Sequence, residues 1–275
     1  MDDRVYPRPN SRLVLSEGPR VISEIASLIS AAPFLFHAPS GDGHPVLVLP
    51  GFGGGDGSTT VLRGFLTSLG YASRPWDLGT NLGPSMPDLQ VELARRLDEV
   101  FVAAGELKVS LIGWSLGGVY ARLLAHRYPD KVRQVITLGS PFAGNPRSTS
   151  VYRIVRNMSD ESFDRRPTSH LRLLAGEPLP GIPSSAVFSK TDGIVPWQIA
   201  TQRPTEIAEN IEVYGSHLGL GFNPAVLYAA ADRLANPERE WRPFARRGWK
   251  RLVYGPALLE DSLSTNRPYK STTEH

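Results

Sequence analysis

The chain has 275 residues, a formal net charge of +3 and no cysteine. The absence of cysteine excludes disulfides, thiolate zinc sites and a cysteine nucleophile, so covalent catalysis would need another side chain. Hydrophobic residues make up 41% of the chain and charged residues 21%, which is typical of a globular protein with an ordinary core. No apolar run approaches the ~20 residues of a membrane span, and the N-terminus lacks the pattern of a secretory signal. We therefore expect a cytoplasmic protein.

The predicted elements begin after a proline-rich start. Residues 19–30 place apolar side chains at helical spacing, and we expect this amphipathic helix to pack on the core. Residues 45–49 form a fully apolar run that is typical of a buried strand, and a glycine-rich turn and a helical pattern follow it. Further along the chain, the patterns predict a strand at 71–76, a helix at 87–104, a strand at 108–112, a helix at 116–127, strands at 132–138, 185–189 and 211–214, and a closing helix at 224–234.

Strands and helices alternate from residue 46 to residue 138. This order predicts an α/β fold with a mostly parallel central sheet and helices on both faces. Residues 143–182 interrupt the alternation and are predicted to form a short cap or lid insertion. We expect one domain over residues 1–261. Residues 262–275 are rich in Ser, Thr, Asn and Pro, which predicts a disordered tail.

The strongest chemical signal is Gly113-Trp114-Ser115-Leu116-Gly117, which matches the pattern G-x-S-x-G. By chance the pattern arises in roughly one chain in ten of this length, so its context decides its meaning. Here it directly follows a predicted strand and precedes a predicted helix, which is the setting of a nucleophile elbow. Flanking glycines relieve backbone collisions in the sharp turn, and the serine hydroxyl is held where open α/β sheets bind ligands.

From these residues the chain resembles the α/β-hydrolase family, and within it the bacterial esterases and lipases. The resemblance covers residues 45–235 and rests on the motifs at 50–53, 113–118, 138–141, 190–193 and 216–217. It implies an α/β-hydrolase fold and the chain order nucleophile, acid, histidine. It also implies that the backbone N–H groups of Phe52 and Leu116 form an oxyanion hole. Many relatives carry a histidine where Pro50 stands in this chain.

The positions of histidines and carboxylates along the chain also indicate the base and the acid of the triad. A serine hydroxyl needs a base, and a histidine held in one tautomer by a carboxylate is the usual one. His217 follows the last predicted strand, and Asp192 follows the strand at 185–189, so both can reach the sheet edge of Ser115. We therefore predict a triad of Ser115, His217 and Asp192. The alternative carboxylates are Asp160, Asp164 and Glu177.

We expect an apolar substrate pocket, because burial of an acyl or alkyl group would select the substrate. Aromatic residues near the predicted strand ends are the candidates for its walls, although such residues are as often part of the core. They are Phe52, Trp76, Trp114, Phe142 and Trp197, together with the apolar Leu116. The glycines at 51–57 complete neither phosphate-binding pattern, and no metal-ligand cluster is present, so we expect neither a cofactor nor a metal.

Basic and aromatic residues interleave over residues 239–251. Such a cluster could make a weak contact with an anionic membrane surface. A solvated helix face with aromatic side chains packed inward is the commoner arrangement. No nucleic-acid partner is expected, and the sequence does not predict an oligomeric state.

Together these features predict a serine carboxylic-ester hydrolase that acts through an acyl-enzyme on a small-molecule or lipid ester. The predicted lid is short, so we expect short- to medium-chain acyl esters. The same triad would also serve an acyltransferase, or an amide, lactone or thioester hydrolase. A non-catalytic ligand binder on the same scaffold is the alternative from another functional class.

Overall fold

The computed structural model describes residues 5–150, 152 and 174–258. Its centre is one sheet of six parallel strands in the order β2-β1-β3-β4-β5-β6. The strands are β1 (Pro45–Leu49), β2 (Ala72–Arg74), β3 (Val109–Trp114), β4 (Val132–Leu138), β5 (Ser184–Phe188) and β6 (Ala208–Glu212). All six run in the same direction, so their carboxyl ends meet at one edge of the sheet. The predicted α/β class with a parallel sheet is confirmed.

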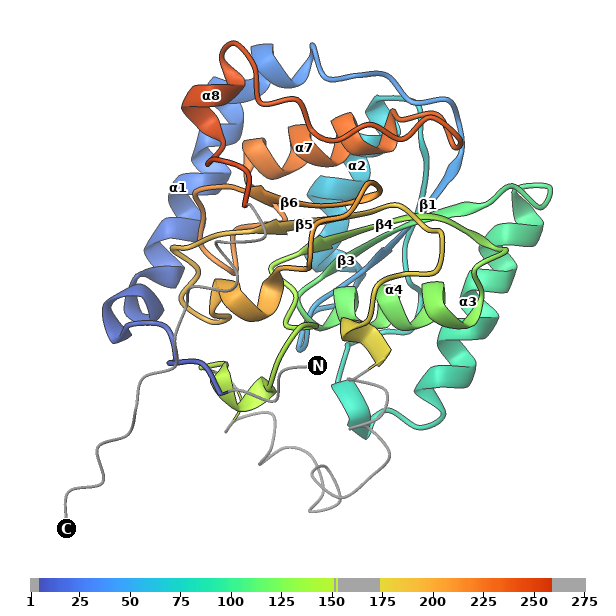
Figure 1. The fold of residues 1–275 in the computed structure, drawn as a ribbon, viewed down its shortest axis with the longest axis horizontal. Helices are drawn as coiled ribbons and strands as arrows, with labels where there is room; N and C mark the ends of the chain where they lie inside the picture. Colours follow the sequence, from blue (N-terminus) through green and yellow to red (C-terminus); the bar gives the residue numbers. More distant parts are fainter. Residues whose placement is uncertain (1–4, 151, 153–173, 259–275) are drawn as a thin grey trace.

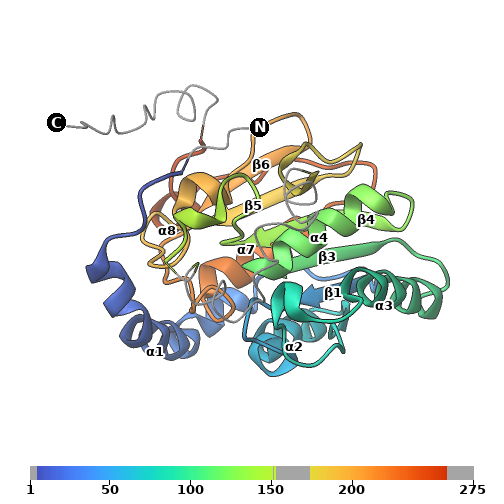
Figure 2. The ribbon, with the colours of Figure 1, turned by 90° about the horizontal axis from the view of Figure 1, so that it is seen from below.

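Helices cover both faces of the sheet, as predicted (Figure 1). On one face lie α2 (Thr60–Ser68) and α7 (Pro224–Leu234), and on the other lie α3 (Leu89–Ala103) and α4 (Leu116–Arg127). Figure 2 shows the sheet from the side that α3 and α4 cover. The alternation of side chains along each strand supplies a separate core to each face.

Strand β1 shows how the two cores are divided. Val46 and Val48 pack in the cluster formed with α2 and α7, whereas Leu47 and Leu49 pack in the cluster formed with α3 and α4. Every residue of β1 is buried. A strand buried on both faces must be apolar throughout, which is why the continuous run at 45–49 was informative in the sequence.

Element boundaries follow the predictions closely where the chain is apolar. Strands β1 and β4 and helices α4 and α7 begin and end at the predicted residues. Strand β6 begins at Ala208, ahead of the predicted 211–214. Its first residues, Ala208, Glu209 and Asn210, form no apolar run that would mark a strand in the sequence. Strand β2, predicted over 71–76, pairs with β1 only from Ala72 to Arg74.

The N-terminal helix departs most from the prediction. Helix α1 spans Ser11–Leu35, longer at both ends than the predicted 19–30, and the side chain of Asn10 caps its first turn. The apolar side chains expected to pack on the core point mostly to solvent, since Ile22 is 71% exposed and Ile29 is 83% exposed. The expectation that this face packs on the core is therefore wrong.

The buried residues of α1 are instead two carboxylates, Glu17 and Glu24. The surface that the helix covers is made largely of loop backbone, whose N–H groups need hydrogen-bond acceptors. Partial burial of Leu28 and Leu35 against the core on the side of α7 adds an apolar contribution. The polar requirement of the loops, and not the apolar pattern of the helix, decides which face turns inward.

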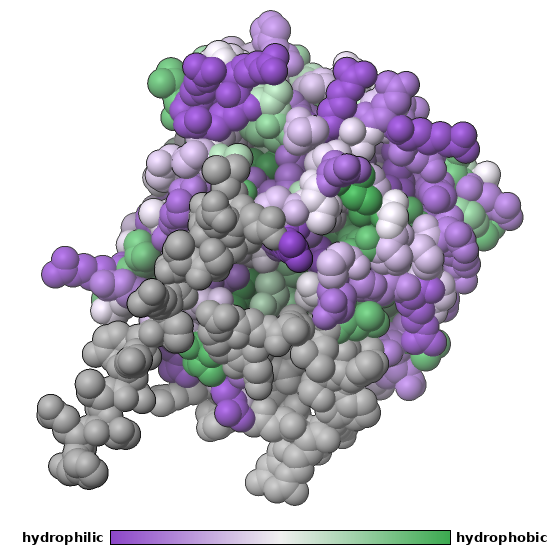
Figure 3. Space-filling view, in the orientation of Figure 1, coloured by the Kyte–Doolittle hydropathy of each residue, from purple (hydrophilic) through white to green (hydrophobic). Residues whose placement is uncertain are grey.

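The basic segment at 239–251 is mostly irregular, and only α8 (Lys250–Val253) is helical. Phe244 packs inward as expected, with its ring centred 4.6 Å from that of Tyr254, whereas Trp249 is 40% exposed. Lys250 Nζ lies 2.6 Å from Asp232 Oδ2, so this cation ties the segment to α7. Figure 3 shows a dense hydrophilic cluster at the top left, where α8 lies. Arg251 is exposed there, and contact with an anionic membrane surface stays a prediction.

The predicted cap at 143–182 is described only up to residue 150, at residue 152 and from residue 174. The remainder of that segment and the whole predicted tail at 262–275 lie outside the described residues. In the part of the chain that the structure describes, no helix is both long and apolar enough to cross a membrane.

Candidate active site

The turn between β3 and α4 holds Ser115 at the carboxyl end of a central strand. Ser115 has φ of 51° and ψ of −121°, a backbone conformation that residues with a side chain rarely adopt. Its N–H donates to the carbonyl oxygen of Leu138 over 2.8 Å, and its carbonyl oxygen accepts from the N–H of Gly118 over 3.0 Å. These bonds hold a strained residue in place, which is the geometry of a nucleophile elbow.

Glycine at position 117 makes this turn possible. A Cβ atom there would lie 2.3 Å from the carbonyl oxygen of Leu49 and 2.7 Å from that of Pro50, far inside van der Waals contact. The start of α4 therefore presses directly on the end of β1. Only glycine permits this approach, which explains the last position of the G-x-S-x-G pattern.

The structure brings the three predicted triad residues together at this edge of the sheet. His217 Nε2 lies 2.9 Å from Ser115 Oγ, and His217 Nδ1 lies 2.6 Å from Asp192 Oδ2. The other oxygen of Asp192 accepts from the backbone N–H groups of Ile194 and Val195, both over 2.7 Å. A carboxylate accepts the Nδ1 proton, so Nε2 is left unprotonated and faces the serine hydroxyl.

Gly139 permits the acid and the histidine to meet. Its φ is +56°, and a Cβ atom there would lie 3.2 Å from both Asp192 Oδ2 and His217 Nδ1. The residue follows β4, so the motif at 138–141 lies beneath the contact between the loops after β5 and β6. A side chain at this position would crowd the acid–histidine pair.

Only Glu177 of the alternative carboxylates falls within the described residues, and Asp192, not Glu177, contacts His217. Asp160 and Asp164 lie outside the described residues. The backbone of Glu177 accepts hydrogen bonds from Arg122 and His126, on α4. Asp192 is the carboxylate that the structure places against His217.

The electrostatics of His217 favour the charged imidazolium. Burial lowers the pKa of His217, but the charge of Asp192, its hydrogen bond to Nδ1 and the charge of Glu17 together raise the pKa above its ordinary value of 6.5. The side chains of His217 and Asp192 are 4% and 2% exposed, so solvent screens the pair only weakly. The site is thus built to accept a proton on His217.

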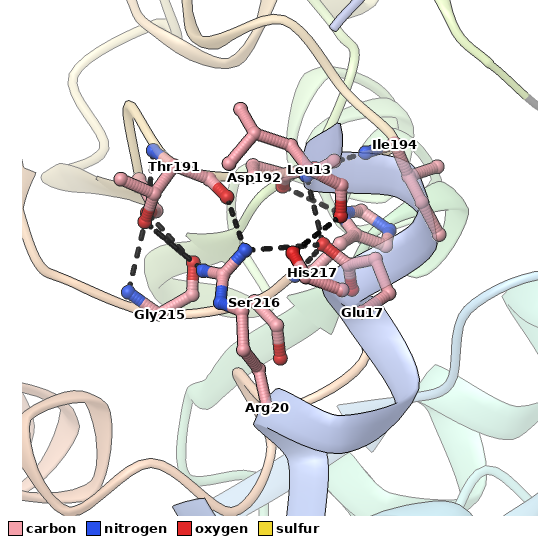
Figure 4. Close-up of polar contacts among 12 residues, drawn as sticks. Leu13, Glu17, Arg20, Thr191, Asp192, Ile194, Gly215, Ser216 and His217 are labelled. Atoms are coloured by element: carbon pink, nitrogen blue, oxygen red, sulfur yellow. Dashed lines mark hydrogen bonds and ion pairs between the residues drawn. The ribbon is translucent and has the colours of Figure 1, made fainter. Parts of the chain in front are cut away.

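Two hydrogen bonds from outside the triad fix the histidine loop. The indole N–H of Trp114 donates to the carbonyl oxygen of His217 over 3.1 Å. Glu17 of α1 accepts from the N–H of His217 over 3.0 Å (Figure 4). Sequence reasoning missed Glu17. The available signal was a pair of acidic residues, 17 and 24, in a helix with no other acidic side chain.

The oxyanion-hole donors implied by the family resemblance are the N–H groups of Phe52 and Leu116. Leu116 is the first residue of α4, so its N–H has no acceptor within the helix. In the described part of the chain, no hydrogen bond uses either N–H group. Both are therefore available to a ligand beside Ser115.

Asn81 anchors the loop that carries Phe52. Its side-chain amide donates to the carbonyl oxygen of Pro50 over 2.9 Å, and its backbone exchanges hydrogen bonds of 2.7 Å with Gly53 and Gly54. Asn81 is completely buried. The hydrogen bonds of Asn81 hold this loop in place although position 50 is a proline and not a histidine. Sequence reasoning missed Asn81, because it lies in an irregular segment far from the loop along the chain.

The expected pocket walls are mostly core residues. Trp76 and Phe142 are almost wholly inaccessible, and each packs inside a core cluster, which corrects the expectation that they face substrate. Trp114 is also buried and acts through its bond to His217. Trp197 is half-buried against Phe188, with ring centroids 5.9 Å apart.

The other two expected wall residues, Phe52 and Leu116, present apolar side chains that meet near Gly83. A Cβ atom on Gly83 would lie 3.3 Å from the ring of Phe52 and 3.4 Å from the side chain of Leu116, so the two converge there. Both are only partly buried, and Leu82 beside them is 45% exposed. Phe52, Leu82 and Leu116 thus present apolar side chains that are not fully buried.

A second Ser–His–Asp arrangement lies at the opposite end of β3. His44 Nε2 lies 2.8 Å from Ser110 Oγ, and His44 Nδ1 is hydrogen-bonded to Asp42. Ser110 is completely buried within the strand, roughly 16 Å from Ser115 by strand geometry. Burial lowers the pKa of His44 below its ordinary value, whereas the net change in the pKa of His217 is upward. This cluster has no access for a substrate and is a structural network.

Comparison with known proteins agrees with this fold. Residues 69–192 match the sequence model of the alpha/beta hydrolase fold. A search of curated proteins finds no match to the chain. Among solved structures, a monoacylglycerol lipase of Paleococcus ferrophilus aligns with a TM-score of 0.50 and 16% identity, over 70% of this chain and 96% of its own.

Two further solved structures are similar. The hydrolase MGS-MChE2, from a sediment metagenome of the Mar Chica lagoon in Morocco, has 21% identity and a TM-score of 0.43, over 67% of this chain and 87% of its own. Mouse alpha/beta hydrolase domain-containing protein 10 has 18% identity and a TM-score of 0.46, over 70% and 88%. Such identities reflect the fold alone. Together with the sheet order and the elbow, the family match shows that the chain has the α/β-hydrolase fold.

Across the described ranges, no group of three or more His, Asp or Glu side chains is arranged to hold a metal ion.

The close approach at Gly117 leads to a testable prediction. Gly117→Ala is expected to lower the free energy of unfolding by about 1–3 kcal/mol and to reduce kcat, because the new methyl group must push α4 away from β1. Denaturant unfolding and ester hydrolysis measure the two effects.

Gly64 provides the matched control. It lies on the exposed side of α2, and an added Cβ would meet nothing within 4 Å. Gly64→Ala is expected to leave kcat unchanged and to leave stability unchanged or raise it by about 0.4–1 kcal/mol. Equal effects of the two substitutions would contradict the role given to Gly117.

Proposed function

We propose that this protein is a serine hydrolase that cleaves carboxylic esters through an acyl-enzyme. The observation that carries the proposal is the unbroken contact from Asp192 through His217 to Ser115, with distances of 2.6 and 2.9 Å, at a strained elbow. Two uncommitted backbone N–H groups lie beside it. A nucleophile, a base with its orienting acid, and an oxyanion site are the parts that acyl transfer requires.

The first half of the reaction forms the acyl-enzyme. Ser115 Oγ attacks the ester carbonyl carbon while its proton moves to His217 Nε2. The carbonyl oxygen becomes an oxyanion that accepts hydrogen bonds from the N–H groups of Phe52 and Leu116, each worth roughly 3 kcal/mol of the barrier. The tetrahedral intermediate then collapses, and the leaving alkoxide takes the proton from His217 as the C–O bond breaks.

The second half regenerates the enzyme. Water attacks the acyl carbon and gives a proton to His217 Nε2, and collapse of the second intermediate returns that proton to Ser115 Oγ. Asp192 keeps its negative charge throughout and stabilises the imidazolium in both halves. The raised pKa of His217 supports this role, since the buried pair favours the charged ring.

The same residues would support transfer to an alcohol, or cleavage of an amide, lactone or thioester. Product analysis with a competing alcohol separates acyl transfer from hydrolysis. A non-catalytic binder is disfavoured because the strained backbone of Ser115 would then have no function to maintain it. The lipase of Paleococcus ferrophilus is similar in fold only, so the substrate class is argued from the site.

Ser115 and Ser110 provide a matched pair for the central prediction. Ser115→Ala is expected to abolish hydrolysis of p-nitrophenyl esters and labelling by a fluorophosphonate probe, because the attacking oxygen is lost. Ser110→Ala removes a hydroxyl with a similar histidine partner and is expected to retain wild-type kcat, at a cost of about 1–2 kcal/mol in stability. Retained turnover in Ser115→Ala would refute the proposal.

The pH dependence follows from the electrostatics of His217. The protonated imidazole cannot accept the serine proton, so kcat/KM is expected to fall as pH decreases through the pKa of His217. Because that pKa is raised, the midpoint of the acid limb should lie above the ordinary value of 6.5. A pH series of kcat/KM measures it, and a midpoint at or below 6.5 would contradict the environment described for His217.

Acyl-chain preference tests the substrate class. We propose short- to medium-chain acyl esters, because the predicted cap at 143–182 is short. A series of p-nitrophenyl esters from acetate to palmitate should show the highest kcat/KM at the shorter members. A maximum at the longest chains would reverse this assignment.

A further inference from the structure

Helix α1 turns a stripe of charged side chains toward the catalytic loops. Figure 4 shows Glu17 and Arg20 extending from the helix to the loops that carry Asp192 and His217. The stripe continues to Glu24, and the spacing of residues 17, 20 and 24 places all three on one side of the helix. Triad chemistry does not itself require any of these residues.

We propose that Glu17 is a positioning residue for the catalytic histidine, whose buried carboxylate joins the acid loop to the histidine loop and places a second negative charge beside the imidazolium. The inference rests on the proposed function and deepens it. It assigns a catalytic purpose to an N-terminal helix whose charged side, and not its apolar side, faces the protein.

The contacts of Glu17 span the two loops. Its Oε1 accepts from the N–H of Gly193 over 2.8 Å and from the N–H of His217 over 3.0 Å. Its Oε2 accepts from the N–H of Leu218 over 2.9 Å. Gly193 directly follows Asp192, so one oxygen atom fixes the backbone of the acid loop relative to that of the histidine loop. Displacement of this oxygen would change the separation of Asp192 from His217.

Burying the Glu17 carboxylate costs free energy, and other interactions must offset that cost. The side chain of Glu17 is 5% exposed, and its only cationic neighbour, among the described residues, is Arg20 Nη1 at 3.9 Å. A buried charge without a close ion pair depends on hydrogen bonds for its stability. Here three backbone N–H groups of the catalytic loops supply them. A helix required only for attachment could have used the isoleucines that it exposes.

The neighbouring charged residues hold the same loops at adjacent points. Arg20 donates to the carbonyl oxygen of Thr191 over 2.7 Å and to its hydroxyl over 3.0 Å. Glu24 accepts from the N–H of Ser216 over 2.7 Å and from its hydroxyl over 2.5 Å. Residues on either side of Asp192 and His217 are thus bound to α1. The helix completes the site from outside the sheet.

The charged groups that face the imidazole of His217 differ in their effect. Asp192 contacts Nδ1 directly, and Glu17 contacts the backbone of the same residue. The carboxylate of Glu24 accepts a hydrogen bond from Ser216, and the guanidinium of Arg20 donates one to Thr191. Of the three charged residues in this stripe, Glu17 is the one whose charge raises the pKa of His217. Because His217 becomes cationic as Ser115 attacks, the same charge favours the transition state.

Glu17→Gln and Glu24→Gln form a matched pair that tests the proposal in the full-length protein. Each variant removes one buried carboxylate of α1 that binds the histidine loop. For Glu17→Gln, kcat should fall about tenfold or more with a smaller change in KM, because the reacting groups are displaced but substrate binding is not. The acid limb of kcat/KM should also move to lower pH. For Glu24→Gln, the acid limb should stay at its wild-type pH.

An NMR titration of the His217 imidazole in the wild-type protein, Glu17→Gln and Glu24→Gln distinguishes failure of this inference from failure of the proposed function. If the wild-type protein hydrolyses no ester, the function fails, while a lower titration midpoint in Glu17→Gln alone still supports the electrostatic part. If the wild-type protein is active but Glu17→Gln keeps its kcat and acid limb, the inference is refuted and the function stands. Equal shifts in both variants also refute it, since they indicate a general loosening of the loop.

Glu17→Asp keeps the test decisive if Glu17→Gln does not fold. The shorter carboxylate keeps its charge but cannot reach Gly193 and Leu218 together, so kcat should fall while the acid limb stays near its wild-type pH. Wild-type kcat in Glu17→Asp would refute the positioning role. If Glu17→Asp keeps the wild-type acid limb but not the wild-type kcat, the charge of Glu17 and the length of its side chain make separate contributions.

Discussion

The close approach of three backbone segments at the carboxyl ends of β1, β3 and β4 governs the rest of this structure. The start of α4 presses on the end of β1 at Gly117, and the resulting turn holds Ser115 in a conformation that costs free energy. A parallel sheet can maintain this strain because its strands are buried on both faces and cannot shift independently. The position of the nucleophile is therefore a property of the packed sheet.

The acid and the histidine are placed by a different principle. Both lie on loops, and loop backbone must find hydrogen-bond partners for its N–H groups when it is buried. Asp192 satisfies two of these groups with the oxygen that does not contact His217, and Glu17 satisfies three more. The polar network that satisfies the loops also sets the distance from Asp192 to Ser115. Stability and catalytic geometry thus share the same hydrogen bonds.

The two Ser–His–Asp arrangements show why geometry alone does not define a site. Ser110 has a histidine at hydrogen-bonding distance and a carboxylate behind it, much like Ser115. Ser110 is buried, and it lacks a strained backbone and nearby N–H groups that are free to bind a ligand. The pKa of His44 is lowered, whereas the pKa of His217 is raised. Access and electrostatics, and not residue identity, separate a candidate catalytic cluster from a structural one.

Patterns in the amino-acid sequence were enough to predict the order of strands and helices, the elbow at Ser115 and the candidate partners His217 and Asp192. These features are local: apolar runs mark buried strands, and a glycine-flanked serine between a strand and a helix marks a sharp turn. Tertiary structure alone decided that Glu17 and Glu24 face inward, that Asn81 anchors the oxyanion loop, and that Trp76 and Phe142 belong to the core. Periodicity reports which residues share a face of a helix. Which face is buried depends on whether the opposing surface offers side chains or unsatisfied backbone, and that surface forms only when distant segments meet.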